Sequence, residues 1–351
     1  MHPKHGFLAL LALLSFGCSS SDSTPKTDAE FEQGLRTQMH DTLLTDIKAL
    51  HAAAVALQAA APEPKGRGWD ETEDAAAITA MKNAWLDARS DYERTEGAIA
   101  PLFPDVDQAI DARYDDFLTE LGPTGDQDLF DDQGVTGMHA IERILFVKTT
   151  PQTVVDLEAS LPGYKAAAWP ATEDEANEFK TKLTVELVKD TQKLADQWTP
   201  QKMDLAGAYA GLIDLMLEQR EKVSKAAGQE EESRYSQRTM ADIRDNLEGT
   251  RKVYALFQPW VDTKKGGTKI DDSVEAAFDQ LGKTYDTVKG DAIPQPPSGW
   301  SSENPSDADL QTPFGKLFTA VENAVNPNTD GSVVDGMTKT ANAVGLMVEQ
   351  P

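Results

Sequence analysis

One short segment places a histidine and a glutamate three residues apart within an apolar helical pattern. His139 and Glu142 share a face of the expected helix, and Glu142 falls inside the apolar arc. A carboxylate among apolar side chains is costly unless a cation, a hydrogen-bonding partner or a metal meets it. Histidine and glutamate at this spacing on a bundle helix can chelate one ion. The alternative is a buried glutamate paired with an arginine, with His139 satisfied in the core.

The two preceding helical segments also turn carboxylates toward an apolar face. Glu96 lies within the apolar arc of the first segment, and Asp107 and Asp111 flank the arc of the second. Several carboxylates with one imidazole suit iron, manganese or zinc better than a soft metal. We therefore predict the metal ligands His139, Glu142, Glu96 and Asp111, with Arg89, Arg113 and Tyr92 in the shell around them.

Two arginines keep a different interpretation open. Arg89 and Arg113 lie beside these carboxylates, so the same residues can form an internal ion-pair network without a metal. In the second half of the chain, Arg220 lies near the centre of one apolar arc, and Asp242 and Asn246 border another. These three side chains are expected either to face the first-half site or to pair with each other.

The elements that must position these residues are helices. Helical periodicity continues through most of the chain, and no segment sustains the alternation of a strand. We predict an all-α fold of two packed helical bundles, residues 27–150 and 173–351, with a distant internal duplication suggested by similar Glu-Gly pairs at 96–97 and 248–249. The expected helices, ended by proline and glycine, cover residues 28–61, 70–100, 105–121, 131–147, 151–161, 173–198, 200–227, 235–257, 271–289, 307–325 and those from 332.

The N-terminus has the pattern of an exported lipoprotein. An apolar run at 7–16 follows Lys4 and is too short to span a bilayer as a helix. Leu14 to Cys18 resembles a bacterial lipobox, in which the cysteine is lipidated and becomes the mature N-terminus. We predict a signal peptide at 1–17, lipidation of Cys18 and a flexible tether at 18–26.

Composition limits the partners. The 351 residues include 59 Asp and Glu against 33 Lys and Arg, a formal net charge of −26. Nucleic acid is not an expected partner, because binding its backbone requires clustered basic residues. The negative charge favours cations instead. A single cysteine excludes a disulfide framework within the chain and any multi-cysteine metal site.

Several motifs in the same order resemble one family. Residues 137–142 (GMHAIE) resemble the G-x-H-x-x-E signature of the imelysin family, and residues 85–93 (WLDARSDYE) resemble its W-x-x-x-R-x-x-Y-E segment. Residues 103–116 are most similar to the EfeO/EfeM branch, and residues 234–249 resemble the second-half block of that branch. Gln237 departs from the pattern, because the branch usually has histidine there, which puts a second imidazole ligand in doubt.

The resemblance implies a function in iron uptake. It implies two packed helical bundles, a metal site at His139 and Glu142, and iron as the bound metal, with zinc or another divalent cation as alternatives. The implied partners are an inner-membrane iron permease and a periplasmic peroxidase. The implied location is the periplasmic side of a bacterial membrane, with the anchor in the inner or the outer membrane.

Two other functions stay open. Imelysin itself was classed as a metallopeptidase, but the zinc-peptidase pattern H-E-x-x-H is absent, since Ala140 follows His139 and Arg143 occupies the second histidine position. A metal-free lipoprotein that binds a ligand such as a polysaccharide is the other alternative, because related proteins include alginate binders.

Overall fold

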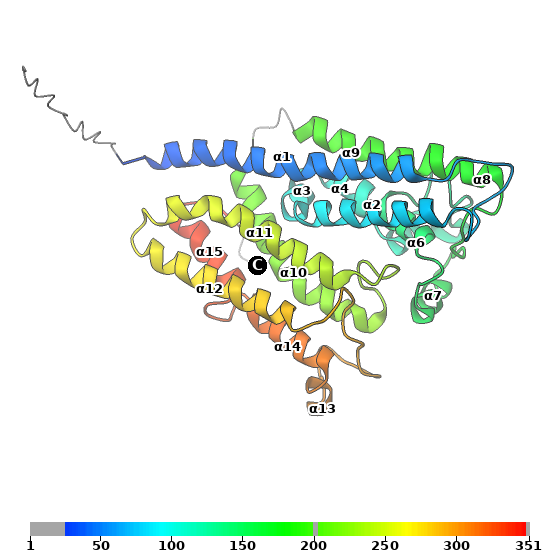
Figure 1. The fold of residues 1–351 in the computed structure, drawn as a ribbon. Coiled ribbons are helices and arrows are strands. Elements are labelled where there is room, and N and C mark those ends of the chain that lie inside the picture. The colour runs from blue at the N-terminus through cyan, green and yellow to red at the C-terminus, as the bar shows by residue number, and fades with distance from the viewer. Residues whose placement is uncertain (1–24, 199–202, 349–351) are drawn as a thin grey trace, which may run out of the picture.

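The computed structural model describes residues 25–198 and 203–348. Within these ranges the chain forms helices and no β-strand, which confirms the all-α prediction (Figure 1). The predicted signal peptide, the lipidation site Cys18 and most of the predicted tether lie outside the described residues.

The elements follow the order of the expected helices. Those before residue 199 are α1 (Asp28–Ala60), α2 (Ala75–Glu93), α3 (Glu96–Leu102), α4 (Pro104–Asp111), α5 (Tyr114–Leu121), η1 (Gly122–Thr124), α6 (Gly137–Leu145), α7 (Gln152–Ala159), α8 (Glu173–Glu178), the π-helical turn η2 (Phe179–Leu183) and α9 (Thr184–Trp198). Those after residue 202 are α10 (Leu205–Lys225), η3 (Ala226–Gly228), α11 (Thr239–Val261), α12 (Gly267–Asp286), α13 (Asp307–Leu310), α14 (Pro313–Val325) and α15 (Val333–Val344).

The helices stack in successive layers. α1 lies along α2 and α9, α10 and α11 pack against α3 and α2, and α12, α14 and α15 cover the far side (Figure 1). The sequence places residues 173–198 in the second bundle, whereas the structure places α9 beside α1 and α4. The seam between the halves is formed mainly by α2 and α3 on one side and α10 and α11 on the other.

α1 is the longest helix in the described part of the chain, and it is a core helix in this structure. By length and composition alone it is apolar enough to cross a membrane. Its side chains Leu43, Ile47 and Leu50 are nonetheless buried in the hydrophobic core. Thr27 begins the helix with a capping box, because its hydroxyl accepts the Glu30 N–H at 3.3 Å and the Glu30 carboxylate accepts the Thr27 N–H at 2.7 Å.

Three of the expected helices are broken in the structure, and two of these breaks lie at the candidate site; the third separates α13 from α14. The predicted helix 70–100 divides at Arg94 and Thr95, where the Thr95 hydroxyl donates to the Tyr92 carbonyl oxygen at 2.9 Å. The predicted helix 105–121 divides at Ala112 and Arg113, which have extended backbone with ψ of 140° and 162°. The first break lets α3 turn Glu96 toward α10, and the second makes Asp111 the last residue of α4.

Glycine allows the halves to approach closely across the seam. A Cβ atom on Gly211 of α10 would lie 2.0 Å from the carbonyl oxygen of Gly97 on α3. A Cβ atom on Gly249 of α11 would lie 2.2 Å from the carbonyl oxygen of Arg94. Both positions oppose backbone rather than flexible side chains, so a larger residue requires the helices themselves to separate.

Gly211→Ala tests this packing. We expect the substitution to lower the free energy of unfolding by roughly 1–3 kcal/mol, as overpacking does in other cores. Urea unfolding followed by circular dichroism measures the change. Gly34→Ala is the matched control: this helical position in α1 has no atom within 4 Å of the added Cβ, so alanine should be neutral or stabilise by up to about 1 kcal/mol. Equal effects at the two positions would contradict the close approach.

Candidate metal centre

The guanidinium of Arg89 lies at the centre of a buried carboxylate cluster in the seam. It forms ion pairs with Glu93, Asp111 and Glu232, and its Nε lies 3.7 Å from Asp242. The side chain of Arg89 is fully buried. Burial alone lowers its pKa, but the carboxylates, Asp111 foremost, raise that pKa well above the ordinary value. Arg89 is therefore a permanent cation, and its planar, multidentate donor geometry can serve several carboxylates at once.

His139 is held with one ring nitrogen bound and the other open. Its Nδ1 lies 2.8 Å from a carboxylate oxygen of Glu142, and the other Glu142 oxygen accepts the Ser236 N–H at 2.8 Å. Because carboxylate can only accept here, Nδ1 carries the proton. The buried Nε2 has no hydrogen-bond partner and lies 3.4 Å from the nearer Asp111 oxygen. Glu142 thus orients the ring, as carboxylates do for metal-binding histidines.

The surroundings of His139 favour its charged form in the metal-free protein. Burial lowers the pKa of the imidazole, but Asp111 and then Glu142 outweigh this effect and raise it to about 9. A cation that binds Nε2 must therefore displace a proton.

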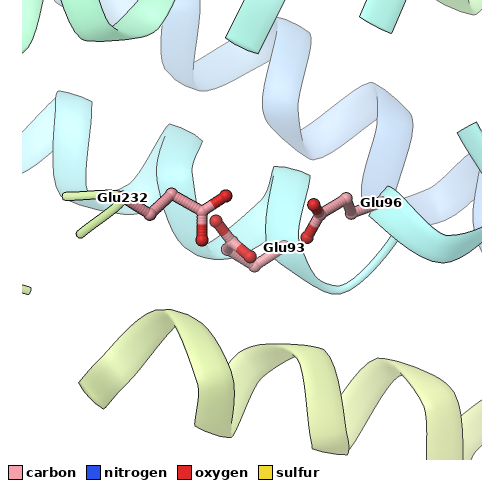
Figure 2. A group of neighbouring side chains, drawn as sticks. All are labelled: Glu93, Glu96 and Glu232. Atoms are coloured by element: carbon pink, nitrogen blue, oxygen red, sulfur yellow. The ribbon is translucent and has the colours of Figure 1, made fainter. Parts of the chain in front are cut away.

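A second group of carboxylates surrounds a lysine. Figure 2 shows Glu93 and Glu96 from the α2–α3 junction and Glu232 from the loop before α11, with carboxylate oxygens that lie within 4.8 Å of one another. Lys222 of α10 contacts all three, and Asn246 of α11 donates to Glu93 and Glu96. Burial raises the pKa of Glu96 to about 7 even though Lys222 acts to lower it.

A pocket connects the cluster to solvent. A cavity of about 370 Å³ reaches Asp111, Lys222 and Glu232. Its remaining lining contains more acidic than basic side chains, so the pocket favours cations. These further residues are Asp107, Gln108, Ala112, Arg113, Asp116, Glu218, Glu221 and Lys225.

The structure brings three of the four predicted ligands together. Asp111, His139 and Glu142 lie side by side, whereas Glu96 lies at the Lys222 end of the cluster. Among the predicted neighbours, Arg89 contacts Asp111 directly. The predicted ion-pair network and the predicted grouping of His139 with carboxylates are therefore present together.

The other predicted residues have different surroundings. The Tyr92 hydroxyl donates to Asp107 at 2.5 Å. Arg113 lies at the pocket and donates to the Glu230 carbonyl oxygen at 3.2 Å rather than to the cluster. The predicted inward orientation of Arg220 is wrong, because this side chain is exposed and pairs with Glu322 on α14.

Three cluster residues were not predicted from the sequence. Helical periodicity places Glu93 at the rim of the apolar arc of its helix, and Glu232 lies in a loop, where there is no periodicity to place it. Lys222 lies on the buried face of α10 that also carries Leu215 and Gln219. The sequence indicates this face only if polar residues are counted as part of it. Asp242 and Asn246, left open by the sequence, are fully buried and face the first half.

A comparison with known protein families decides the relationship. The family model of imelysin (Peptidase_M75) matches residues 36–323. The chain belongs to the imelysin family. The resemblance inferred from the G-x-H-x-x-E motif is thereby confirmed, and this motif supplies the His139 and Glu142 pair of the cluster.

Curated proteins similar to this imelysin chain include components of iron-uptake systems. The proteins named "Iron uptake system component EfeO" from Escherichia coli (strain K12) and Shigella flexneri are 29% identical to it over 211 residues. The alignments cover 60% of this chain and 44% of each relative. The chain thus spans less than half the length of the curated relatives it matches.

Arg89→Met tests the central position of the guanidinium. We expect it to lower the free energy of unfolding by about 3–5 kcal/mol, because it leaves buried carboxylates without their counterion. Urea unfolding at pH 7.5 measures the loss. Arg220→Met is the matched control, since an exposed arginine paired with Glu322 should change stability by less than about 1 kcal/mol. A small effect at Arg89 would show that the cluster does not depend on it.

Stability of the metal-free protein should fall as the pH rises from 6 to 9. The pKa of His139 is raised to about 9 in the folded chain, so its stabilising contribution is present below about pH 6.5 and is lost as the pH rises through 9. Burial raises the pKa of Asp107 to about 7 and that of Asp242 to about 8, and these groups act in the same direction. Urea unfolding with a chelator present should show a loss from His139 of about 3 kcal/mol. His139→Gln should flatten the profile, and an unchanged slope would contradict this assignment.

Proposed function

We propose that this imelysin protein is an exported iron-binding component of an iron-uptake system, which holds iron as cargo at His139 and Asp111. One observation carries the proposal. The Nε2 atom of His139 is buried without a hydrogen-bond partner, and it lies 3.4 Å from an Asp111 oxygen. Glu142 fixes the ring so that Nε2 faces Asp111, and a metal that binds there displaces the Nε2 proton.

The chemistry of the donor set supports iron. Imidazole with carboxylate oxygens suits iron, manganese or zinc, and the family resemblance to EfeO favours iron among them. The excess of acidic side chains in the pocket concentrates cations at its mouth.

The N-terminal pattern supports a place outside the cytoplasm. A short apolar segment followed by Cys18 fits export and lipid anchoring on the periplasmic side of a bacterial membrane. In this setting an inner-membrane iron permease would receive the metal, and a periplasmic peroxidase is a second proposed partner.

Metal capture fits the contacts of Glu142 better than peptide hydrolysis does. A metallopeptidase requires a general base free to activate metal-bound water. Both Glu142 oxygens are already engaged, by the His139 ring and by the Ser236 N–H. The other histidines in the described ranges, His40 and His51, bond to residues of α9 instead.

Metal titration of single variants tests the proposed site. We expect the wild-type protein to bind Fe²⁺ under anaerobic conditions with one ion per chain. His139→Ala should abolish this binding, because it removes the nitrogen ligand. Glu142→Gln should weaken it by about 10–100-fold, because orientation of the ring is lost. Isothermal titration calorimetry gives both the affinity and the stoichiometry.

His51→Ala is the matched control for these measurements. His51 bonds to Thr191 at 3.1 Å on the α1–α9 face, so its loss should leave the affinity for Fe²⁺ unchanged. Absence of binding by the wild-type protein at micromolar iron would overturn the proposed function. Hydrolysis of casein that disappears in His139→Ala would favour the peptidase alternative.

A further inference from the structure

The ammonium group of Lys222 occupies a position that resembles a cation site. Its Nζ lies 2.7 Å from Glu232, 2.9 Å from Glu96 and 3.6 Å from Glu93. The oxygens of these three carboxylates lie within 4.8 Å of one another, which is the span of ligands around a single metal ion (Figure 2). A cation already occupies this group, and the protein supplies it from α10.

The charge of Lys222 is fixed by its surroundings. Burial lowers the pKa of the amine, but Glu232, Glu93 and Glu96 together raise it well above the ordinary value. The side chain is 8% exposed, and it reaches the group from the wall of the same cavity that leads to Asp111. Lysine therefore remains an ammonium ion here and does not leave the carboxylates unpaired.

The carboxylates are held in place by other groups. The Asn246 amide donates to Glu93 at 2.6 Å and to Glu96 at 2.9 Å, and Arg89 pairs with Glu93 and with Glu232. Replacement of the lysine would thus leave three positioned acceptors around a space that held a positive charge. Three buried carboxylates cannot remain ionised together without compensation.

The Lys222 position is separate from the proposed iron position. Arg89 lies between them, because the same guanidinium contacts Asp111 at one end and Glu93 and Glu232 at the other. Two cations bound at the two ends would both be reached from one cavity. Only the end with His139 has an open nitrogen ligand.

We infer that Lys222 sets the metal capacity of this pocket at one ion: its ammonium occupies the second cation position, formed by Glu93, Glu96 and Glu232, and keeps metal out of it. The inference rests on the proposed function for the identity of the first ion. It adds a residue that determines stoichiometry and confines metal to the His139 end.

Lys222→Met tests the inference, with Mn²⁺ as a redox-stable probe. Native mass spectrometry of the full chain should find one Mn²⁺ in the wild-type protein and two in Lys222→Met. Lys225→Met is the matched control on the same helix, because Lys225 also lines the cavity but pairs with Glu221 rather than with the three carboxylates. It should leave the count at one. A folded Lys222→Met protein that binds no more Mn²⁺ than the wild type would overturn the inference.

A double variant separates this inference from the proposed function. Lys222→Met combined with His139→Ala should bind one Mn²⁺, whereas His139→Ala alone should bind none. If His139→Ala still binds one ion and the double variant binds two, the proposed iron site fails but the role of Lys222 stands. If the double variant binds no more ions than His139→Ala, the role of Lys222 fails.

Folding of the variant is a separate readout. If Lys222→Met does not fold without metal, we expect Mn²⁺ to restore its thermal transition. Lys222→Gln, which keeps a hydrogen-bond donor, is measured in parallel. No increase in melting temperature with Mn²⁺ for either variant, beyond the increase for wild type, would overturn the inference.

Discussion

The fully buried guanidinium of Arg89 is the constraint on which the seam of this protein depends. A charge removed from water must be compensated by ion pairs and hydrogen bonds, or folding fails. The compensating carboxylates come from four separate places: Glu93 on α2, Asp111 on α4, Asp242 on α11 and Glu232 in the preceding loop. Burying one arginine therefore fixes elements from both halves of the chain relative to each other.

The negative charge of this carboxylate cluster is paired differently at its two ends, and this difference gives rise to the candidate site. At one end Lys222 and Asn246, which both come from the second half of the chain, pair with the glutamates. At the other end Asp111 contacts Arg89 and faces His139, whose Nε2 has no hydrogen-bond partner. Since Glu142 holds the opposite side of the ring, the end without a lysine is also the end with an oriented nitrogen ligand. A negative pocket leads to that end.

The sequence predicts most of the helices but not the breaks that arrange the site. Periodicity identifies α1 almost to its last residue, turns Glu96 and Glu142 inward and places Asp111 at the edge of its apolar arc, because these signals are local. The breaks at Thr95 and Arg113 have local hydrogen bonds, from the Thr95 hydroxyl to the Tyr92 carbonyl oxygen and from the Arg113 N–H to Asp116, which helical periodicity does not reveal. Pro259 misleads in the opposite direction: α11 continues through it to Val261, since proline near a helix end removes a single backbone hydrogen bond.

Charged partners from distant segments are the least predictable part. Arg220 and Lys222 are two residues apart on α10, and the apolar arc alone selects the arginine, which is exposed. Lys222 is instead buried against the carboxylates of α2 and α3, and the periodicity of α10 alone cannot reveal this contact. Glu232 has no periodic context at all, because it lies in a loop.

Anomalous diffraction at the iron absorption edge, from crystals grown anaerobically with Fe²⁺, tests the central claim most directly. The account predicts a single peak about 2.1 Å from the Nε2 atom of His139, on the side of Asp111, with the Lys222 ammonium still among its three glutamates. An iron peak among Glu93, Glu96 and Glu232 with Lys222 displaced, and none at His139, would contradict it.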